Sequence, residues 1–403
     1  MNQTSSDIKS SLNVDFSQIT IELIADLSAK KLENTIQPIL TAESYHHIFS
    51  ALSLAAVWHL PPGADLLRQL AVAYRFRSAD RAFLISLIEC FKAEQTEQAQ
   101  LRSPQLGPSD SPQKSFQQLR GSMYYGDAEA ADDAVTKICR TASMFQVFEF
   151  TFELGIQDLS AYAKKAATAL QYWKLLQIIG FGHCSPLLRA LVRYFCQSAT
   201  GATRTDRHDN RCWIEGESLA NKIPNNWTKN FVSSTTANPY QFIQIMIENE
   251  ATIAMNEVSK QLMKGHHPWW VWLATFQIAQ SPIRIEDTDL RNEDLFLGVS
   301  ALFEISQTVA SPDLRLKAML QAVGLVSDEI NSQADFNDNL SRPAIDLYNL
   351  LQTRVNQETE LSQSHNTAER IPGITYSRCI RYLRLYEVIS AVSFWIQCQA
   401  THD

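Results

Sequence analysis

Histidines are the residues of this sequence whose spacing most strongly suggests chemistry. They include two adjacent pairs, His46-His47 and His266-His267. Adjacent side chains on a helix point about 100° apart, so one pair does not easily hold a single metal ion. A mononuclear site would instead take one imidazole from each pair, His46 and His267. Glu43 lies three residues before His46 on the same predicted helical face, and this arrangement is half of a carboxylate-bridged di-metal site.

We therefore predict a metal site with the ligands Glu43, His46 and His267. The chain has no second Glu-x-x-His pattern, so the metal itself is not assigned and the cofactor stays unknown. The alternative is structural: each of these imidazoles begins a helix or is buried and hydrogen-bonded in the core.

Another histidine, His183, precedes Cys184 at the start of a helix that Ser185 and Pro186 open. A thiol at a helix N-terminus has its thiolate form favoured by the helix dipole. Nucleophilic catalysis by the pair would require the imidazole to reach the sulfur, which adjacent residues rarely achieve. A loop pair in a tight interhelical turn is the alternative, and His183 is kept as a candidate catalytic residue beside His46 and His267.

Aromatic side chains give the candidate substrate pocket, to which we assign Tyr74, Trp173 and Trp270. One predicted helix has large aromatic side chains on nearly every side, at Trp269, Trp270, Trp272 and Phe276. Such a run is usually core packing, and a pocket for an apolar or aromatic ligand is the functional alternative.

Composition excludes several classes of protein. The formal charge of −8 argues against nucleic acid as a principal partner, because phosphate binding needs a basic surface. The polar N-terminus lacks a secretory apolar segment, and the stretch 48–60 is too short to span a bilayer. The seven cysteines form no Cys-x-x-Cys motif, which favours core thiols in a reducing compartment. We expect a cytoplasmic protein without membrane insertion.

The elements that must position these residues are helices. Apolar residues recur with helical period along almost the whole chain, and no convincing pair of strands is found. Glycine is scarce, at 13 of 403 residues, which also disfavours turn-dense β folds. We predict an all-α, multi-helix bundle whose helices from the middle of the chain onward cover about 114–124, 127–141, 143–154, 158–179, 186–195, 240–265, 267–279, 290–308, 312–332, 340–355 and 374–399.

We divide the chain into an N-terminal helical half with a Pro/Ser-rich linker (1–113), central helices (114–225) and a C-terminal helical half (226–403), packed as one compact unit. A weak repeat supports two duplicated halves, since each histidine pair heads an apolar helix that a proline ends. Chance similarity between amphipathic helices is the alternative. A duplication would place a pocket between the halves.

Loose motifs are spread over much of the sequence, at Ala131–Val135, Trp173–His183, Pro186–Leu191, His267–Trp270 and Leu316–Ala322. Together they resemble an uncharacterised family of bacterial, histidine-rich, all-helical proteins. In that resemblance His46, His183 and His267 stand at matching places. Further histidines of the family pattern are absent near 66–74, 163–165 and 292–303, so most of any metal or haem shell that the resemblance implies is missing.

We expect an enzyme that acts on a small apolar or aromatic molecule between the halves, with metal-assisted oxidation in specialised metabolism as the first reaction class. His46, His183 and His267 are its predicted catalytic groups. The alternative is a non-catalytic helical module that binds a ligand or a protein, in which the histidines are structural. The expected partner of the enzyme is a small-molecule substrate. We expect neither nucleic acid binding nor membrane insertion, and no oligomeric state is predicted.

Overall fold

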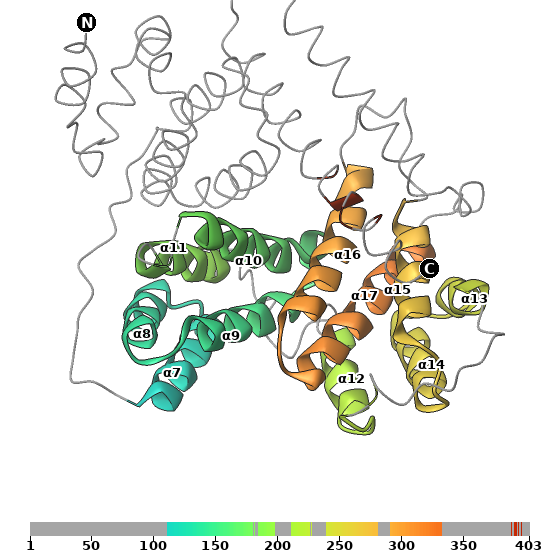
Figure 1. Ribbon diagram of the computed structural model, residues 1–403, viewed down its shortest axis with the longest axis horizontal. Coiled ribbons are helices and arrows are strands. Elements are labelled where there is room, and N and C mark those ends of the chain that lie inside the picture. The colour runs from blue at the N-terminus through green and yellow to red at the C-terminus, as the bar shows by residue number, and fades with distance from the viewer. Residues whose placement is uncertain are drawn as a thin grey trace, which may run out of the picture.

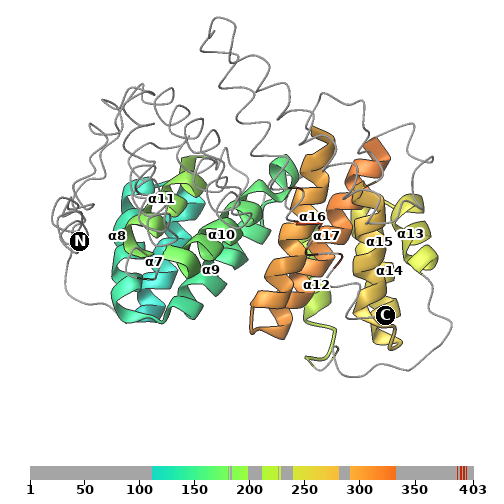
Figure 2. The same ribbon diagram turned by 45° about the horizontal axis from the view of Figure 1, so that its top comes forward.

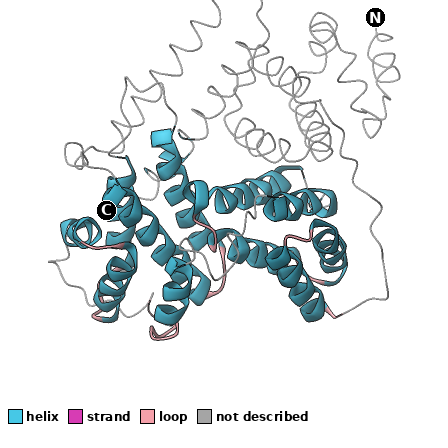
Figure 3. Ribbon diagram, turned by 180° about the vertical axis from the view of Figure 1, so that it is seen from behind, coloured by secondary structure: helices cyan, strands magenta, loops and turns pink. Residues whose placement is uncertain are grey.

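A computed structural model describes residues 111–179, 181, 184–197, 211–225, 227, 239–280 and 291–332, together with residues 388, 391, 392, 394 and 396. In these ranges the regular elements are helices and no strand occurs, which confirms the all-α prediction (Figure 3). The helices are Pro112–Tyr125 (α7), Ala128–Thr141 (α8), Met144–Ile156 (α9), Ser160–Ile179 (α10), Cys184–Gln197 (α11), Arg211–Ala220 (α12), Pro239–Glu248 (α13), Ala251–Met263 (α14), Pro268–Gln280 (α15), Arg291–Thr308 (α16) and Pro312–Ser332 (α17).

The described helices form two groups that meet along one main junction (Figures 1 and 2). Helices α7 to α11 pack on one another, and helices α12 to α17 pack on one another. The junction is formed mainly by α10 against α16, with a smaller contact between α9 and α17. Helix α12, which precedes the predicted division at residue 225, packs against α14 and α17. The predicted duplication stays a prediction, because the first histidine pair lies outside the described residues.

Local sequence signals explain where the helices begin and end. The Ser143 hydroxyl accepts from the Gln146 amide, and the Gln146 side chain accepts from the Ser143 amide, so a reciprocal capping box begins α9. Asp127 caps α8 through one side-chain bond, since its carboxylate accepts from the Ala130 backbone amide at 3.0 Å. Gly126 ends α7 with a left-handed φ of 70°, a conformation that glycine adopts without steric cost.

The core is apolar and rich in aromatic side chains in both groups of helices. Between α15 and α16, Phe303 packs against Trp272 and Phe276 at ring-centroid distances of 5.0 and 5.4 Å. Trp269 and Trp272 are buried, as core packing of the aromatic run requires. The largest fully buried side chains are Phe148, Phe152, Tyr172, Phe195, Phe242, Phe276 and Phe296.

A glycine allows the two groups to approach closely. A Cβ atom at Gly298 of α16 would lie 2.2 Å from the carbonyl oxygen of Tyr162, so only glycine fits at this crossing. Tyr162 belongs to a left-handed turn with φ of 48°, 59° and 56° at Ala161, Tyr162 and Ala163. Each left-handed residue other than glycine costs about 1–2 kcal/mol. The Tyr162 hydroxyl donates to Glu329 at 3.3 Å, a contact that ties this turn to α17.

Two predicted boundaries are wrong. The stretch 240–265 is two helices, α13 and α14, because the Asn249 side chain donates to the Ile245 carbonyl at 2.8 Å and Glu250 has extended backbone angles. Side chains that bond the backbone in this way compete with helix continuation. Helix α12 begins inside the stretch predicted as a loop over about 200–213. Cys212 and Trp213 are buried there, although the preceding residues are polar.

Candidate functional site at the junction of α10 and α16

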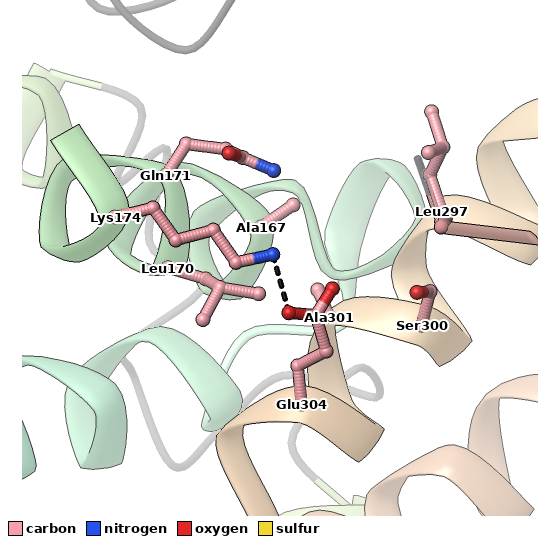
Figure 4. A pocket seen from close by; sticks show the side chains of 9 residues that line it. Ala167, Leu170, Gln171, Lys174, Leu297, Ser300, Ala301 and Glu304 are labelled. Atoms are coloured by element: carbon pink, nitrogen blue, oxygen red, sulfur yellow. Dashed lines mark ion pairs between the residues drawn. The ribbon is translucent and has the colours of Figure 1, made fainter. Parts of the chain in front are cut away.

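A shallow recess lies where the two groups of helices meet (Figure 4). Its volume is about 280 Å³ when the side open to solvent is included, and the part that protein closes off admits little more than a water molecule. Helices α10 and α16 supply nearly all of the lining, and Ala391 adds to it. The lining residues are Ala167, Leu170, Gln171, Lys174, Leu297, Ser300, Ala301, Glu304 and Ala391.

A buried ion pair crosses this recess. The Lys174 ammonium of α10 pairs with the Glu304 carboxylate of α16, and their side chains are only 10% and 11% exposed. Figure 4 shows both side chains reaching across the junction toward each other. Transferring a charge from water into such surroundings costs several kcal/mol unless an opposite charge compensates it, so each group stabilises the other.

Two further polar groups in the recess have no hydrogen-bond partner among the described residues. They are the amide oxygen of Gln171 and the hydroxyl of Ser300, whose residues are 8% and 1% exposed. Gln171 lies one turn before Lys174, and Ser300 lies one turn before Glu304, so each charge has a polar neighbour on its own helix. A buried group without a partner costs about 1–3 kcal/mol. The recess therefore holds a paired ammonium and carboxylate, and beside them an acceptor and a hydroxyl to which a bound molecule can hydrogen-bond.

The sequence predicted His267 and Trp270 as site residues, and they lie at the N-terminus of α15. The Nδ1 atom of His267 accepts from the Trp269 backbone amide at 3.0 Å, and the His267 carbonyl accepts from the Trp270 amide at 3.1 Å. These bonds satisfy amide groups at the start of a helix. Trp270 is partly buried against the core. Neither residue lines the recess, and their predicted roles in a metal site and a substrate pocket stay predictions.

Trp173 is a neighbour of Lys174 in sequence but contacts other aromatic side chains. Its ring lies 4.8 Å from that of Phe148, 5.5 Å from that of Phe145 and 5.6 Å from that of Phe181, centroid to centroid. The residue itself is 5% exposed and does not line the recess. Its assignment to a substrate pocket therefore has no support from the recess and stays a prediction.

The other predicted site residues lie outside the described residues: Glu43, His46, Tyr74 and His183. In the described part of the chain, no group of three or more His, Cys, Asp or Glu side chains is arranged to hold a metal ion. The metal-assisted oxidation expected from the histidines stays a prediction, because most of the residues on which it depends lie outside the described part of the chain.

A second buried charge cluster joins α8 to α11. The Asp132 carboxylate is fully buried and accepts from Arg189 at 2.5 and 2.8 Å and from Arg193 at 2.8 Å. A carboxylate bound by the fork of one arginine and by a second arginine is strongly compensated. This cluster fixes how the two helices lie against each other.

Two thiols meet at the same helix pair. Cys139 donates a hydrogen bond to Cys184, which lowers the pKa of the Cys184 thiol to about 7, helped by the Ser185 backbone amide. The same bond raises the pKa of Cys139 far above its ordinary value. Burial instead raises the pKa of Cys196 to about 11 and of Cys212 to about 12. The direction at Cys184 agrees with the effect expected from its place at a helix start, although Cys139 is the larger cause.

The residues of the recess were not singled out in the sequence, but a signal was present. Lys174 and Glu304 are single charges inside long apolar runs, LQYWKLLQII and SALFEIS. A charge in such a run is buried only when another charge pairs with it. Each apolar run therefore predicts that its charged residue pairs with an opposite charge. It does not predict which of the many acidic or basic residues of the chain supplies that charge.

Among the described helices, none combines the length and the apolar character needed to cross a bilayer. Comparison of the sequence with protein-family models, with curated proteins and with solved structures finds no match.

Proposed function

We propose that the protein binds a small zwitterionic molecule, such as a free amino acid, in the recess between α10 and α16. The observation that supports this proposal is the Lys174–Glu304 ion pair, beside which lie two buried polar atoms that no described residue hydrogen-bonds. This function belongs to the non-catalytic class of ligand-binding helical modules that the sequence left open.

The charges of the recess favour a zwitterion over a simple cation or anion. When a ligand separates Lys174 from Glu304, each buried charge needs a new partner. The ligand's carboxylate pairs with Lys174, and its ammonium group pairs with Glu304. A molecule with only one charge would leave either the lysine or the glutamate uncompensated. The ammonium and carboxylate groups of an α-amino acid are also close together. This short separation suits the Lys174 ammonium and the Glu304 carboxylate, which are in contact with each other.

The neutral polar groups complete the recognition. The Gln171 amide oxygen accepts from the ligand's ammonium group, and the Ser300 hydroxyl donates to its carboxylate. Neither atom has a hydrogen-bond partner among the described residues, so both gain a bond to the ligand. The remaining lining is small and apolar, at Ala167, Leu170, Leu297, Ala301 and Ala391. A small apolar side chain on the ligand fits such a surface, and because the enclosed space is small, side chains of the lining must move apart on binding.

Thermal unfolding in the presence of each proteinogenic amino acid, one at a time, tests this proposal. A ligand that binds only the folded state stabilises it by RT ln(1 + [L]/Kd), so the Tm rises with the logarithm of the ligand concentration once that concentration exceeds the Kd. We expect at least one small amino acid to raise the Tm of the wild-type protein.

Variants connect such a shift to the recess. Ser300→Ala and Gln171→Leu remove one contact each without leaving a buried charge. Each should weaken binding by about 10- to 150-fold, since a hydrogen bond to a charged group contributes about 1.5–3 kcal/mol. Lys260→Met removes an exposed lysine that pairs with Glu257 on its own helix, and it should leave binding unchanged. Equal shifts in all of these variants would place the ligand elsewhere and contradict the proposal.

A further inference from the structure

Helices α8 and α11 lie side by side in antiparallel orientation. Near the start of α8, Asp132 pairs with Arg189 and Arg193 in the middle of α11. Beyond the N-terminus of α8, Met123 of α7 contacts Cys196 near the end of α11, with a distance of 3.9 Å between their sulfurs. Both contacts define the same register, in which later residues of α8 face earlier residues of α11.

This register places Cys139, in the last turn of α8, opposite Cys184, the first residue of α11. Their thiols are within hydrogen-bond distance of each other and both are free. Both residues are half-buried, whereas the other described cysteines, Cys196 and Cys212, are buried. A small oxidant therefore has access to one pair of adjacent thiols, while the other two described thiols are shielded.

We propose that Cys139 and Cys184 form a redox-active dithiol, which a hydroperoxide converts into an intramolecular disulfide between α8 and α11. Cys184 is the attacking thiol because the Cys139 thiol donates to its sulfur, and because the Ser185 amide, at the start of a helix, also favours its thiolate. Cys139 is the resolving thiol. It already donates to the Cys184 sulfur, so its own sulfur lies next to the atom it must attack.

The reaction has two balanced steps. In the first, the Cys184 thiolate attacks the terminal oxygen of the hydroperoxide, the O–O bond breaks, and the products are a sulfenic acid and, after protonation, an alcohol or water. In the second, the Cys139 sulfur attacks the Cys184 sulfur, the S–O bond breaks, and the Cys139 proton leaves with the hydroxide as water. Two thiols lose two electrons and two protons, and one hydroperoxide is reduced.

Peptide mapping of the full chain after treatment with hydrogen peroxide tests this directly. Free thiols are alkylated after oxidation, and trypsin then releases the peptides Ile138–Arg140 and Leu175–Arg189, each with one cysteine. We expect these two peptides to be recovered linked, with a mass two hydrogens below the sum of the separate peptides. Treatment with dithiothreitol before digestion should abolish the linked species.

Variants separate the two roles. Cys139→Ser removes the resolving thiol, so a sulfenic acid should accumulate on Cys184 and react with dimedone, which should label the wild-type protein far less. Cys184→Ser should leave Cys139 unoxidised, because the attacking thiolate is gone. Cys212→Ser is the matched control and should give the same linked peptide as the wild type. Oxidation of Cys184 without the linked peptide, or linkage of Cys184 to another cysteine, would overturn the proposal.

Discussion

Replacing the two members of the Lys174–Glu304 pair, singly and together, tests whether the junction of α10 and α16 depends on a compensated pair of buried charges. Each side chain is about nine-tenths buried. Lys174→Met removes the ammonium that pairs with the Glu304 carboxylate, and Glu304→Met removes the carboxylate that pairs with the Lys174 ammonium. Removing one member of a buried pair costs about 3–5 kcal/mol. The slight remaining exposure favours the lower end, so we expect each single variant to lose about 3 kcal/mol of unfolding free energy.

The double variant distinguishes compensation from simple packing. With both charges replaced by methionine no charge is left unpaired, and such replacements are often neutral or stabilising. We therefore expect the double variant to be more stable than either single variant, as measured by urea unfolding followed by circular dichroism. The pair Lys317–Asp313 is the control, because Asp313 is 43% exposed and exposed pairs contribute about 0.2–1 kcal/mol. A double variant whose loss equals the two single losses added together would refute this account of the junction.

Three further predictions concern the packing and the thiols. Gly298→Ala should lower the Tm through a loss of about 1–3 kcal/mol of unfolding free energy, because the new Cβ would lie 2.2 Å from the Tyr162 carbonyl oxygen. The control Gly121→Ala in α7, whose Cβ would meet nothing within 4 Å, should raise stability by up to about 1 kcal/mol. Equal effects of the two substitutions would contradict the close crossing of α10 and α16. Asp132→Asn should cost about 3 kcal/mol in urea unfolding, because two arginines whose side chains are only 11% and 14% exposed lose their counter-charge. An unchanged unfolding free energy would contradict this role of Asp132. Alkylation of Cys184 by iodoacetamide should accelerate as the pH rises through about 7, and Cys139→Ala should move that midpoint to higher pH, where the thiolate forms without its donor.

The sequence predicted the helical elements well because they depend on local signals. Ser143 and Gln146 form the capping box that begins α9, and the apolar stripe from Tyr162 onward matches the buried face of α10. The break at Asn249 was missed because it depends on a single side chain that bonds its own backbone. Neither flanking segment loses its apolar period there, so periodicity alone predicts one helix.

The recess could not be predicted, because its halves are far apart in the sequence. Gln171 and Lys174 meet Ser300 and Glu304 only when α10 crosses α16, and that crossing depends on Gly298. Only one member of the thiol pair could be identified from the sequence. The start of a helix near Cys184 was predicted, but no pattern identified Cys139 as its neighbour, because their contact depends on the antiparallel packing of α8 and α11.

Isothermal titration calorimetry tests the central claim, that this recess recognises a zwitterion, most directly. The amino acid that raises the Tm most is titrated beside its amine analogue, which lacks the carboxylate, and its acid analogue, which lacks the ammonium group. The account predicts that the amino acid binds with one site per chain and at least about tenfold more tightly than either analogue, since each analogue leaves one buried charge unpaired. Absence of binding by every amino acid, or equal affinity for the amino acid and its singly charged analogues, would contradict the account.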